Sequence, residues 1–365
     1  MKKFSNVKGI ALDAHFRGVG CVNYDSKEQA SFIRFNTNLY SGDALKHNNV
    51  VLAKKQFYTA GISENGKTMY TFKYKVSSDC LKSDIFKDTV PYQNPSIANL
   101  DCVLYNAIAN PGMLTRGYMF TSQVGNTLRK KSALTLTDAV EIGPERTSFN
   151  LDIHSRSGQK KEKENENDPG DNSMFYRETV GELDYKADGG IDLEELQFVP
   201  ADVMYDRMAV ELDGGEKQKI YFDALRRNLV NFEPEVKPYY IPNTYVEDNC
   251  PEQGVLLNKE SVDFLVKRLL KRILSVNIVR RDAYFKSSGL KVSIITDEGK
   301  FTENITLDNI DDFYFEYSQK YFEADKEKYT KIMADAKIVE EAKKNKKEAK
   351  KKKSKKTDAS EIEAE

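Results

Sequence analysis

The sequence has few of the residues that build metal or redox sites. Its 365 residues include only four cysteines and three histidines. The cysteines lie far apart and form no Cys-x-x-Cys pair, which argues against structural zinc and a disulfide framework and fits reduced thiols. With so few histidines, we also expect no His-rich metal site and no cofactor.

Long apolar runs are missing as well. No stretch approaches the roughly 20 residues of a membrane helix, and the first residues, MKKFSNVKGIALDAHF, hold no long apolar segment of a signal peptide. Hydrophobic residues make up 39% of the chain and aromatic residues 11%, which is enough for a core. We therefore expect a soluble, cytoplasmic protein without membrane contacts.

Known catalytic motifs are absent too, including Gly-x-Ser-x-Gly, His-Glu-x-x-His and the kinase set. Asp13/His15 and Asp152/His154 could each place two ligands on one strand face, but neither pair has an evident third ligand. The segment GNTLRKKS lacks the glycine that a phosphate-binding P-loop has before Lys-Ser. We predict that the protein is not an enzyme.

The charge is balanced overall but unevenly distributed. The formal net charge is −1, yet residues 343–356 hold ten lysines and one acid. Subtracting these from 56 basic and 57 acidic residues leaves 46 and 56, an acidic body. Binding of nucleic acid by this body would require local basic grooves. The lysine tail could contact nucleic acid non-specifically or serve only as a solubilising appendage.

The hydrophobic pattern predicts interleaved strands and helices. Apolar and polar side chains alternate over 10–17, which is typical of a strand with one buried face, and Gly18 and Gly20 indicate a bulge or bend. Asn65-Gly66 predicts a hairpin turn. The hairpin spans 50–76, helices follow at about 79–88, started by Ser78, and at 97–109, and strands at 113–120 and 133–140.

In the second half, a long polar stretch spans 146–188, and its core segment GQKKEKENENDPGDN, at 158–172, is predicted to be a flexible insertion. Asn258 is predicted to cap a helix over 259–275. Other predicted elements are a strand at 191–199, a helix at 217–231, a strand and turn at 289–301, and a charged helix from about 322 that frays into the tail. This pattern favours an α+β fold with an RRM-like sheet, on which the polar face of the first strand is available to a ligand.

Residues 115–132, TRGYMFTSQVGNTLRKKS, place four basic side chains around a short Gly-containing loop, and no acid follows until Asp138. Basic side chains contact phosphates, and hydroxyl and amide groups donate hydrogen bonds to them. An exposed turn with a solvated charge run is the alternative interpretation. The candidate RNA-binding residues here are Arg116, Ser122, Gln123, Asn126, Thr127, Arg129, Lys130, Lys131 and Ser132.

A second candidate site lies at the far end of the polar insertion. Met174, Phe175 and Tyr176 adjoin this hydrophilic segment, and Arg177 follows. An apolar tip on a protruding loop could wedge between stacked bases. Alternatively, the segment is a strand that buries its aromatic side chains in the core.

A third candidate site is the pair Arg280-Arg281, which follows the predicted basic helix. These guanidinium groups could reach phosphates. They could equally form ion pairs with nearby acids such as Asp282.

Three segments in this order resemble a known family: MLTRGYMFTSQVGNTLRKKSALTLTDAVE, GGIDLEELQFVPADVMYDR and QGVLLNKESVDFLVKRLLKRI. Together they look like the backbone subunit of type I-F variant CRISPR Cascade complexes, within the repeat-associated mysterious protein (RAMP) superfamily. The resemblance spans about residues 7–300, and none of the three segments is an enzyme motif.

The resemblance implies a modified RRM-like (ferredoxin-like) palm over residues 1–320, with long insertions. These are a web or finger region at about 36–95 and a thumb hairpin at about 146–188. Residues 321–365, expected to be a charged helix and a flexible lysine-rich tail, depart from the family pattern. The resemblance also implies that the loop 122–132 lies against guide phosphates. It further places His15 and Arg17 on the RNA-facing side of the first strand and makes Met174 and Phe175 candidate wedge residues.

The implied function is that of a non-catalytic subunit that polymerises along a CRISPR RNA and holds the guide–target heteroduplex by its shape. Expected partners are the CRISPR RNA, the target DNA strand, adjacent copies of the chain, and the large, 5′ handle-binding and 3′ hairpin-binding subunits. Two alternatives stay open. One is a metal-dependent RAMP ribonuclease that uses Asp13 or Asp25, and the other is a generic single-stranded RNA-binding protein.

Overall fold

The structure is a computed structural model. It describes residues 2–24, 50–66, 68–89, 100–121, 127–143, 149–155, 174–201, 208–240, 251–280 and 283–317. The predicted charged helix and tail, Asp25, and residues 36–49, 67 and 90–95 of the web region therefore lie outside the described residues.

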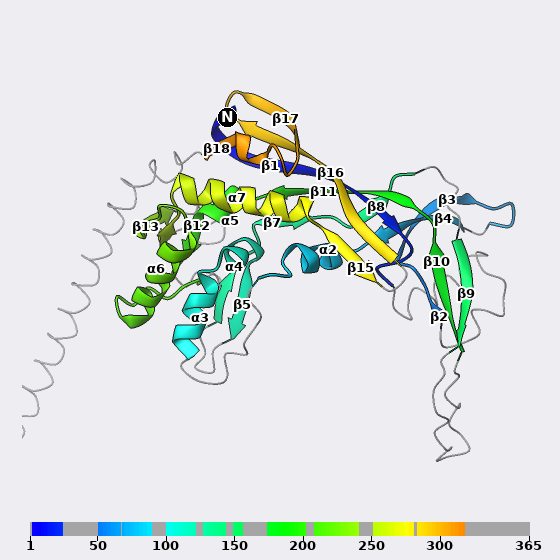
Figure 1. The fold of residues 1–365 in the computed structure, drawn as a ribbon, viewed down its shortest axis with the longest axis horizontal. Coiled ribbons are helices and arrows are strands. Elements are labelled where there is room, and N and C mark those ends of the chain that lie inside the picture. The colour runs from blue at the N-terminus through cyan, green and yellow to red at the C-terminus, as the bar shows by residue number, and fades with distance from the viewer. Residues whose placement is uncertain are drawn as a thin grey trace, which may run out of the picture.

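One large sheet forms the body of the molecule (Figure 1). Its neighbouring strands are antiparallel, except that β18 runs parallel to β1. The order is β15-β16-β1-β11-β8-β4-β3, with β17 beside β16, β18 beside β1 and β7 beside β11. The bounds are β1 Lys2–Val19, β3 Lys55–Ile62, β4 Thr68–Val76, β7 Leu134–Leu136, β8 Ala139–Glu141, β11 Leu183–Ile191, β15 Asn277–Arg280, β16 Ala283–Thr296, β17 Gly299–Ile305 and β18 Phe313–Tyr317.

The first predicted strand is confirmed and is longer than its pattern suggested. In β1 the side chains of Ile10, Leu12, Ala14 and Phe16 are buried, and those between them are more exposed. The predicted bend is confirmed at Gly20, which has φ 73° directly after the strand. The predicted hairpin turn at Asn65-Gly66 joins β3 and β4, and Gly66 has φ 74°.

Helices cover one side of this sheet. Helix α7 (Lys259–Leu274) contacts β16 and β18, and Asn258 caps it by accepting a hydrogen bond from the Ser261 backbone N–H, as predicted. Helix α2 is capped by Ser77 rather than by the predicted Ser78. The remaining helices are α2 Ser78–Ile85, α3 Leu100–Ile108, α4 Pro111–Arg116, α5 Leu193–Gln197, α6 Glu216–Asn228 and the 3-10 turn η2 Ile310–Asp312.

Two predicted strands begin as helices instead. Residues 113–116 belong to α4, because Asn110 caps its first turn and Pro111 occupies the first helical position. Residues 193–197 form α5, because the Asp192 carboxylate accepts a hydrogen bond from the Glu195 N–H. Strands follow each helix, namely β5 Tyr118–Thr121 and β12 Phe198–Pro200; β12 pairs with β14 (Pro251–Leu256), which pairs with β13 (Glu235–Tyr240).

The segment predicted to be a flexible insertion, 158–172, lies outside the described residues, and paired strands lie on either side of it in the sequence. Strands β9 (Phe149–Ser155) and β10 (Met174–Val180) pair antiparallel, and β2 (Val50–Val51) pairs with β10. Residues 183–188 belong to β11, a strand inside the main sheet. We call β9 and β10 the arm; it extends away from the body in Figure 1. Residues 156–173, which link β9 and β10 in the sequence, lie outside the described residues.

In the part of the chain that the structure describes, no helix is both long and apolar enough to cross a membrane.

Candidate nucleic-acid interface

The basic segment 115–132 folds into a two-stranded hairpin of β5 and β6 (Thr127–Lys130). Side chains alternate across it, so that Tyr118 faces Lys130 on the buried side and Met119 faces Arg129 on the exposed side. The Tyr118 hydroxyl donates to the Ala209 carbonyl at 2.7 Å, and Leu128 is buried. The hairpin therefore has one face in the core and one in solvent.

Lys130 does not face solvent with its basic neighbours, contrary to the prediction. Only 3% of it is exposed, and its ammonium donates to the Glu195 carbonyl and, at 3.2 Å, to the Phe198 carbonyl. These carbonyls lie at the C-terminal end of α5, where a helix leaves acceptors unpaired. Burial lowers the pKa of Lys130 to about 8. Lys130 thus holds α5 against the hairpin and is unavailable to a surface ligand.

The base of the hairpin depends on Gly117. This residue has φ 77°, and a Cβ built there would lie 2.5 Å from the Lys130 carbonyl oxygen and 2.6 Å from the Ser132 nitrogen. The Ala133 N–H donates to the Thr115 carbonyl at 3.1 Å. The backbone that carries Arg116 is therefore pressed against the backbone of residues 130–132.

Two arginines of this segment, Arg116 and Arg129, are exposed. Within the described part of the chain, neither the Arg116 nor the Arg129 guanidinium makes a hydrogen bond or ion pair. Lys131 is exposed, and its ammonium lies 3.6 Å from a Glu195 carboxylate oxygen. A guanidinium without an acidic partner is free to bind a phosphate, which it can do with two parallel hydrogen bonds.

The other predicted residues of the segment contribute less. The Ser132 hydroxyl donates to the Leu134 carbonyl at 3.0 Å and accepts from the Leu134 N–H, which closes a local turn. Thr127 is half-buried and pairs with Thr121 in the hairpin. Ser122, Gln123 and Asn126 lie outside the described residues.

The cations that β1 and β11 place on the open face of the main sheet are already paired with acids. Arg17 donates to the Asp184 carboxylate at 2.9 and 3.5 Å, and this contact raises its pKa. His15 Nε2 lies 2.9 Å from Asp13 Oδ1. Lys186 lies between two acids, 3.5 Å from Asp13 and 3.1 Å from Asp188. The polar face predicted for the first strand exists, but its charges largely cancel.

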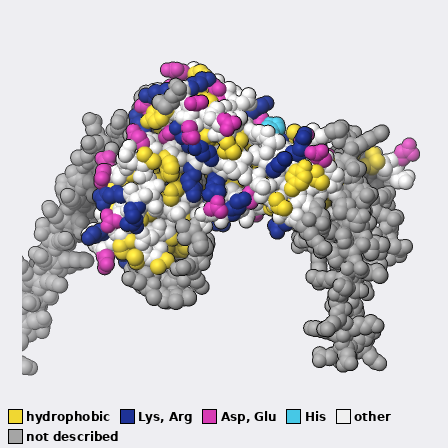
Figure 2. All heavy atoms as spheres, in the orientation of Figure 1, with side chains coloured by type: hydrophobic (Ala, Val, Ile, Leu, Met, Phe, Trp, Pro, Cys, Tyr) yellow, Lys and Arg dark blue, Asp and Glu magenta, His cyan; other side chains and the backbone are white. Residues whose placement is uncertain are grey.

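A further basic surface runs along α7. Figure 2 shows Lys and Arg side chains gathered over the middle of this face, where α7 and α2 lie in Figure 1. Lys271 pairs with Asp311 at 2.8 Å, and Arg272 pairs with Asp88. Arg268 is half-buried, and its pKa is lowered by burial and by the neighbouring Arg272.

The remaining predicted residues are placed only in part. Met174, Phe175 and Arg177 belong to β10, so the predicted strand is present, but their side chains lie outside the description. Arg280 is exposed at the end of β15 and makes no ion pair with a described residue. Arg281 and its predicted partner Asp282 are not among the described residues. Nor do the described residues include a group of three or more His, Cys, Asp or Glu that could hold a metal.

A family model for type I-Fv CRISPR-associated Cas7fv-like proteins matches residues 7–325 of this sequence. The chain belongs to the Cas7fv-like family. The resemblance seen in the three segments is thereby confirmed. No curated protein matches the chain significantly.

Among solved structures, the chain is similar to a chain of a CRISPR RNA-guided surveillance complex, with 11% identity and a TM-score of 0.34 over 79% of this chain and 70% of that one. It is also similar to a chain of a pre-nicking CRISPR RNA-guided surveillance complex, with 10% identity and a TM-score of 0.35 over 78% of this chain and 75% of that one.

Proposed function

We propose that this Cas7fv-like protein is a non-catalytic backbone subunit that binds the phosphates of a CRISPR RNA through the exposed face of the β5–β6 hairpin. The observation that carries the proposal is the pair of exposed arginines, Arg116 and Arg129, that have no acidic partner among the described residues. A filament subunit must bind guides of any sequence, which requires phosphate contacts rather than base-edge hydrogen bonds.

In this proposal the main sheet and the helices on one side of it are an RRM-like palm, and the arm is the thumb of the family. Copies of the chain line the guide, and the target DNA strand is held through the heteroduplex by shape. The other partners are the large subunit and the subunits that bind the two ends of the guide. Arg17, His15 and Arg280 contribute secondary contacts, and Met174 and Phe175 remain candidate wedge residues.

Charge reversal on the hairpin tests the proposal. In cells that express the guide, the variant R116E/R129E/K131E should lose the co-purifying CRISPR RNA, because three cations that face solvent become anions. Lys130 is left unchanged because it is buried. The matched control K219E/R226E/R227E makes the same charge change on exposed residues of α6. Equal RNA retention by both folded variants would refute the hairpin as the guide site.

A further inference from the structure

The root of the arm contains a carboxylate that is fully removed from water. Glu178, in β10, has no exposed side-chain surface. An ionised carboxylate in the interior is costly unless donors surround it. Its bonding partners therefore show what holds the arm in place.

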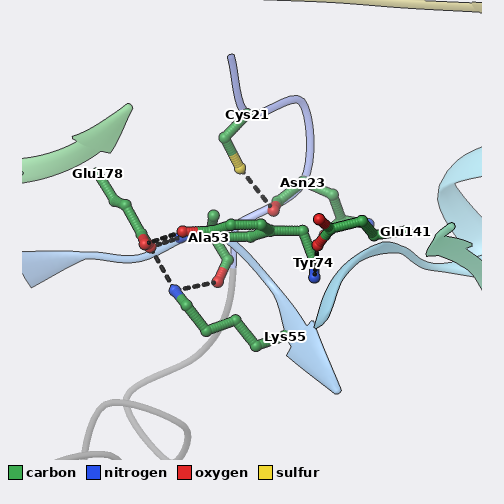
Figure 3. Close-up of polar contacts among 7 residues, drawn as sticks. All are labelled: Cys21, Asn23, Ala53, Lys55, Tyr74, Glu141 and Glu178. Atoms are coloured by element: carbon green, nitrogen blue, oxygen red, sulfur yellow. Dashed lines mark hydrogen bonds and ion pairs between the residues drawn. The ribbon is translucent and has the colours of Figure 1, made fainter. Parts of the chain in front are cut away.

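Donors from three other positions converge on Glu178 (Figure 3). The Ala53 N–H donates at 2.9 Å and the Tyr74 hydroxyl at 2.7 Å. The third donor is the ammonium of Lys55, whose side chain is also fully buried and which donates to the Ala53 carbonyl at 3.2 Å. This ammonium lies 5.3 and 5.0 Å from the ring centres of Phe72 and Tyr74, a favourable cation–π geometry.

Tyr74 extends the connection from the arm into the main sheet. Its side chain reaches Glu178, while its backbone N–H donates to the Glu141 carboxylate of β8 at 3.1 Å. Strand β4, which carries Tyr74, also pairs with β8. At the end of β10, the Gly20 N–H donates to the Val180 carbonyl at 2.8 Å. The arm is thus tied to the strands of the sheet by directional bonds.

Such a cluster is better suited to fixing an orientation than to adding stability. A buried ion pair can often be replaced by apolar side chains of similar size without loss of stability, because its desolvation cost offsets its attraction. Apolar contacts are non-directional, whereas the Glu178 carboxylate is satisfied only when donors on β3, β4 and the segment before β3 meet it together.

We propose that Glu178, Lys55 and Tyr74 are positioning residues that hold the arm at one angle to the main sheet. A fixed arm angle also gives successive subunits a constant spacing on the guide RNA. This second part of the inference rests on the proposed function.

The arm angle can be measured in the isolated, full-length protein. Spin labels attached through non-natural amino acids at position 150 of β9 and position 219 of α6 report the distance from arm to body. We expect a single narrow distance distribution in the parent protein. It should broaden in E178Q, which replaces one acceptor oxygen by a donor, and in Y74F, which removes the hydroxyl donor.

The decisive variant is K55M/E178L, which replaces the pair by apolar side chains of similar length. If the cluster positions the arm, this variant keeps its melting temperature but its distance distribution broadens. If the cluster only stabilises the fold, the distribution stays narrow, and that result would overturn the proposal.

D263N is the matched control, because Asp263 also pairs with a lysine, Lys267, at 2.8 Å and accepts the Phe315 N–H, far from the arm in sequence and fold. It should lower stability and leave the arm distance unchanged. Broadening in D263N equal to that in K55M/E178L would also count against the proposal.

Retention and nuclease protection of the guide RNA distinguish a failure of this inference from a failure of the proposed function. In assembled complexes, K55M/E178L should retain RNA but lose the regular pattern of nuclease protection along it. If the parent protein retains no guide RNA, the proposed function fails, while the label distances still decide the role of the cluster.

Discussion

The β5–β6 hairpin and the open face formed by β1 and β11 both present basic side chains. The two surfaces differ in how far acidic side chains pair with these cations. On the sheet, Arg17 and Lys186 lie against Asp184, Asp188 and Asp13. On the hairpin, Arg116 and Arg129 have no such partner within the described residues. The pairing on the sheet also shows in the pKa of Lys186, which hydrogen bonding to Asp188 raises.

This difference shows that a count of basic residues is a poor guide to a phosphate site. An exposed ion pair contributes little to stability, yet its acid still competes with an incoming phosphate for the same cation. An unpaired guanidinium has no competitor to displace. In an acidic body, the absence of nearby carboxylates is therefore more informative than the presence of lysine or arginine.

The largest expected effect on stability comes from disturbing the backbone conformation at the base of the hairpin. Gly117→Ala should lower the free energy of unfolding by about 3 kcal/mol, because alanine disfavours φ 77° and its Cβ would overlap the Lys130 carbonyl. It should weaken guide binding as well, because Gly117 lies next to Arg116 and against the backbone of Lys131. Urea denaturation and RNA retention measure the two effects.

Gly289→Ala on the sheet is the matched control for this substitution. Gly289 lies in β16 opposite His15, and a Cβ there would meet nothing within 4 Å. It should change stability by less than about 0.5 kcal/mol. If both substitutions were equally mild, the close approach at Gly117 would have no energetic role.

The sequence predicted the elements in which apolar and polar residues alternate regularly, or which have a characteristic turn or capping residue. The alternation in β1, the Asn65-Gly66 turn and the Asn258 cap of α7 were read correctly. Short elements were missed, because α4 and α5 span only a turn or two and their apolar residues fit a strand equally well. The hydrophobic pattern did not predict β9, whose pairing with β10 is a long-range contact that local propensity does not encode.

For the site, the sequence located the basic hairpin but not the direction of each side chain. A strand through Leu128 turns Arg129 outward and Lys130 inward, so the burial of Lys130 follows from alternation once β6 is recognised. The pairing of Arg17 with Asp184 could not be predicted, because β1 and β11 meet only in the folded sheet. The same holds for the cluster around Glu178.

An intermediate effect is expected from the buried lysine of the hairpin. Lys130 has a pKa near 8 in the folded protein and an ordinary value of 10.5 when unfolded. Between these values the unfolded chain holds one more proton, so the free energy of unfolding gains up to about 1.4 kcal/mol per pH unit as pH rises. Lys130→Met should remove this gain, which urea denaturation of both proteins at about pH 7.5 and about pH 9 would measure.

Other titrating groups, such as the buried tyrosines, are common to both proteins and cancel in the difference. The half-buried lysine Lys186 provides the contrast, because Lys186→Met should leave the pH dependence over this range close to that of the parent protein. Identical pH slopes for the parent and Lys130→Met would contradict a pKa of Lys130 lowered by burial.

The smallest expected effect, on RNA affinity, compares the hairpin with the sheet most directly. Arg129→Ala should weaken binding of single-stranded RNA several-fold. It should also reduce the magnitude of the slope of log K against log salt by about 0.7, the change expected when one phosphate contact is lost. Arg17→Ala should change the slope much less, because Asp184 and Glu182 already neutralise that guanidinium. Removing these acids with D184N/E182Q should then strengthen binding and steepen the slope, since it leaves Arg17 in the unpaired state of the hairpin arginines. If Arg17→Ala reduced the slope as much as Arg129→Ala, pairing with acids would not be what distinguishes the sheet from the hairpin.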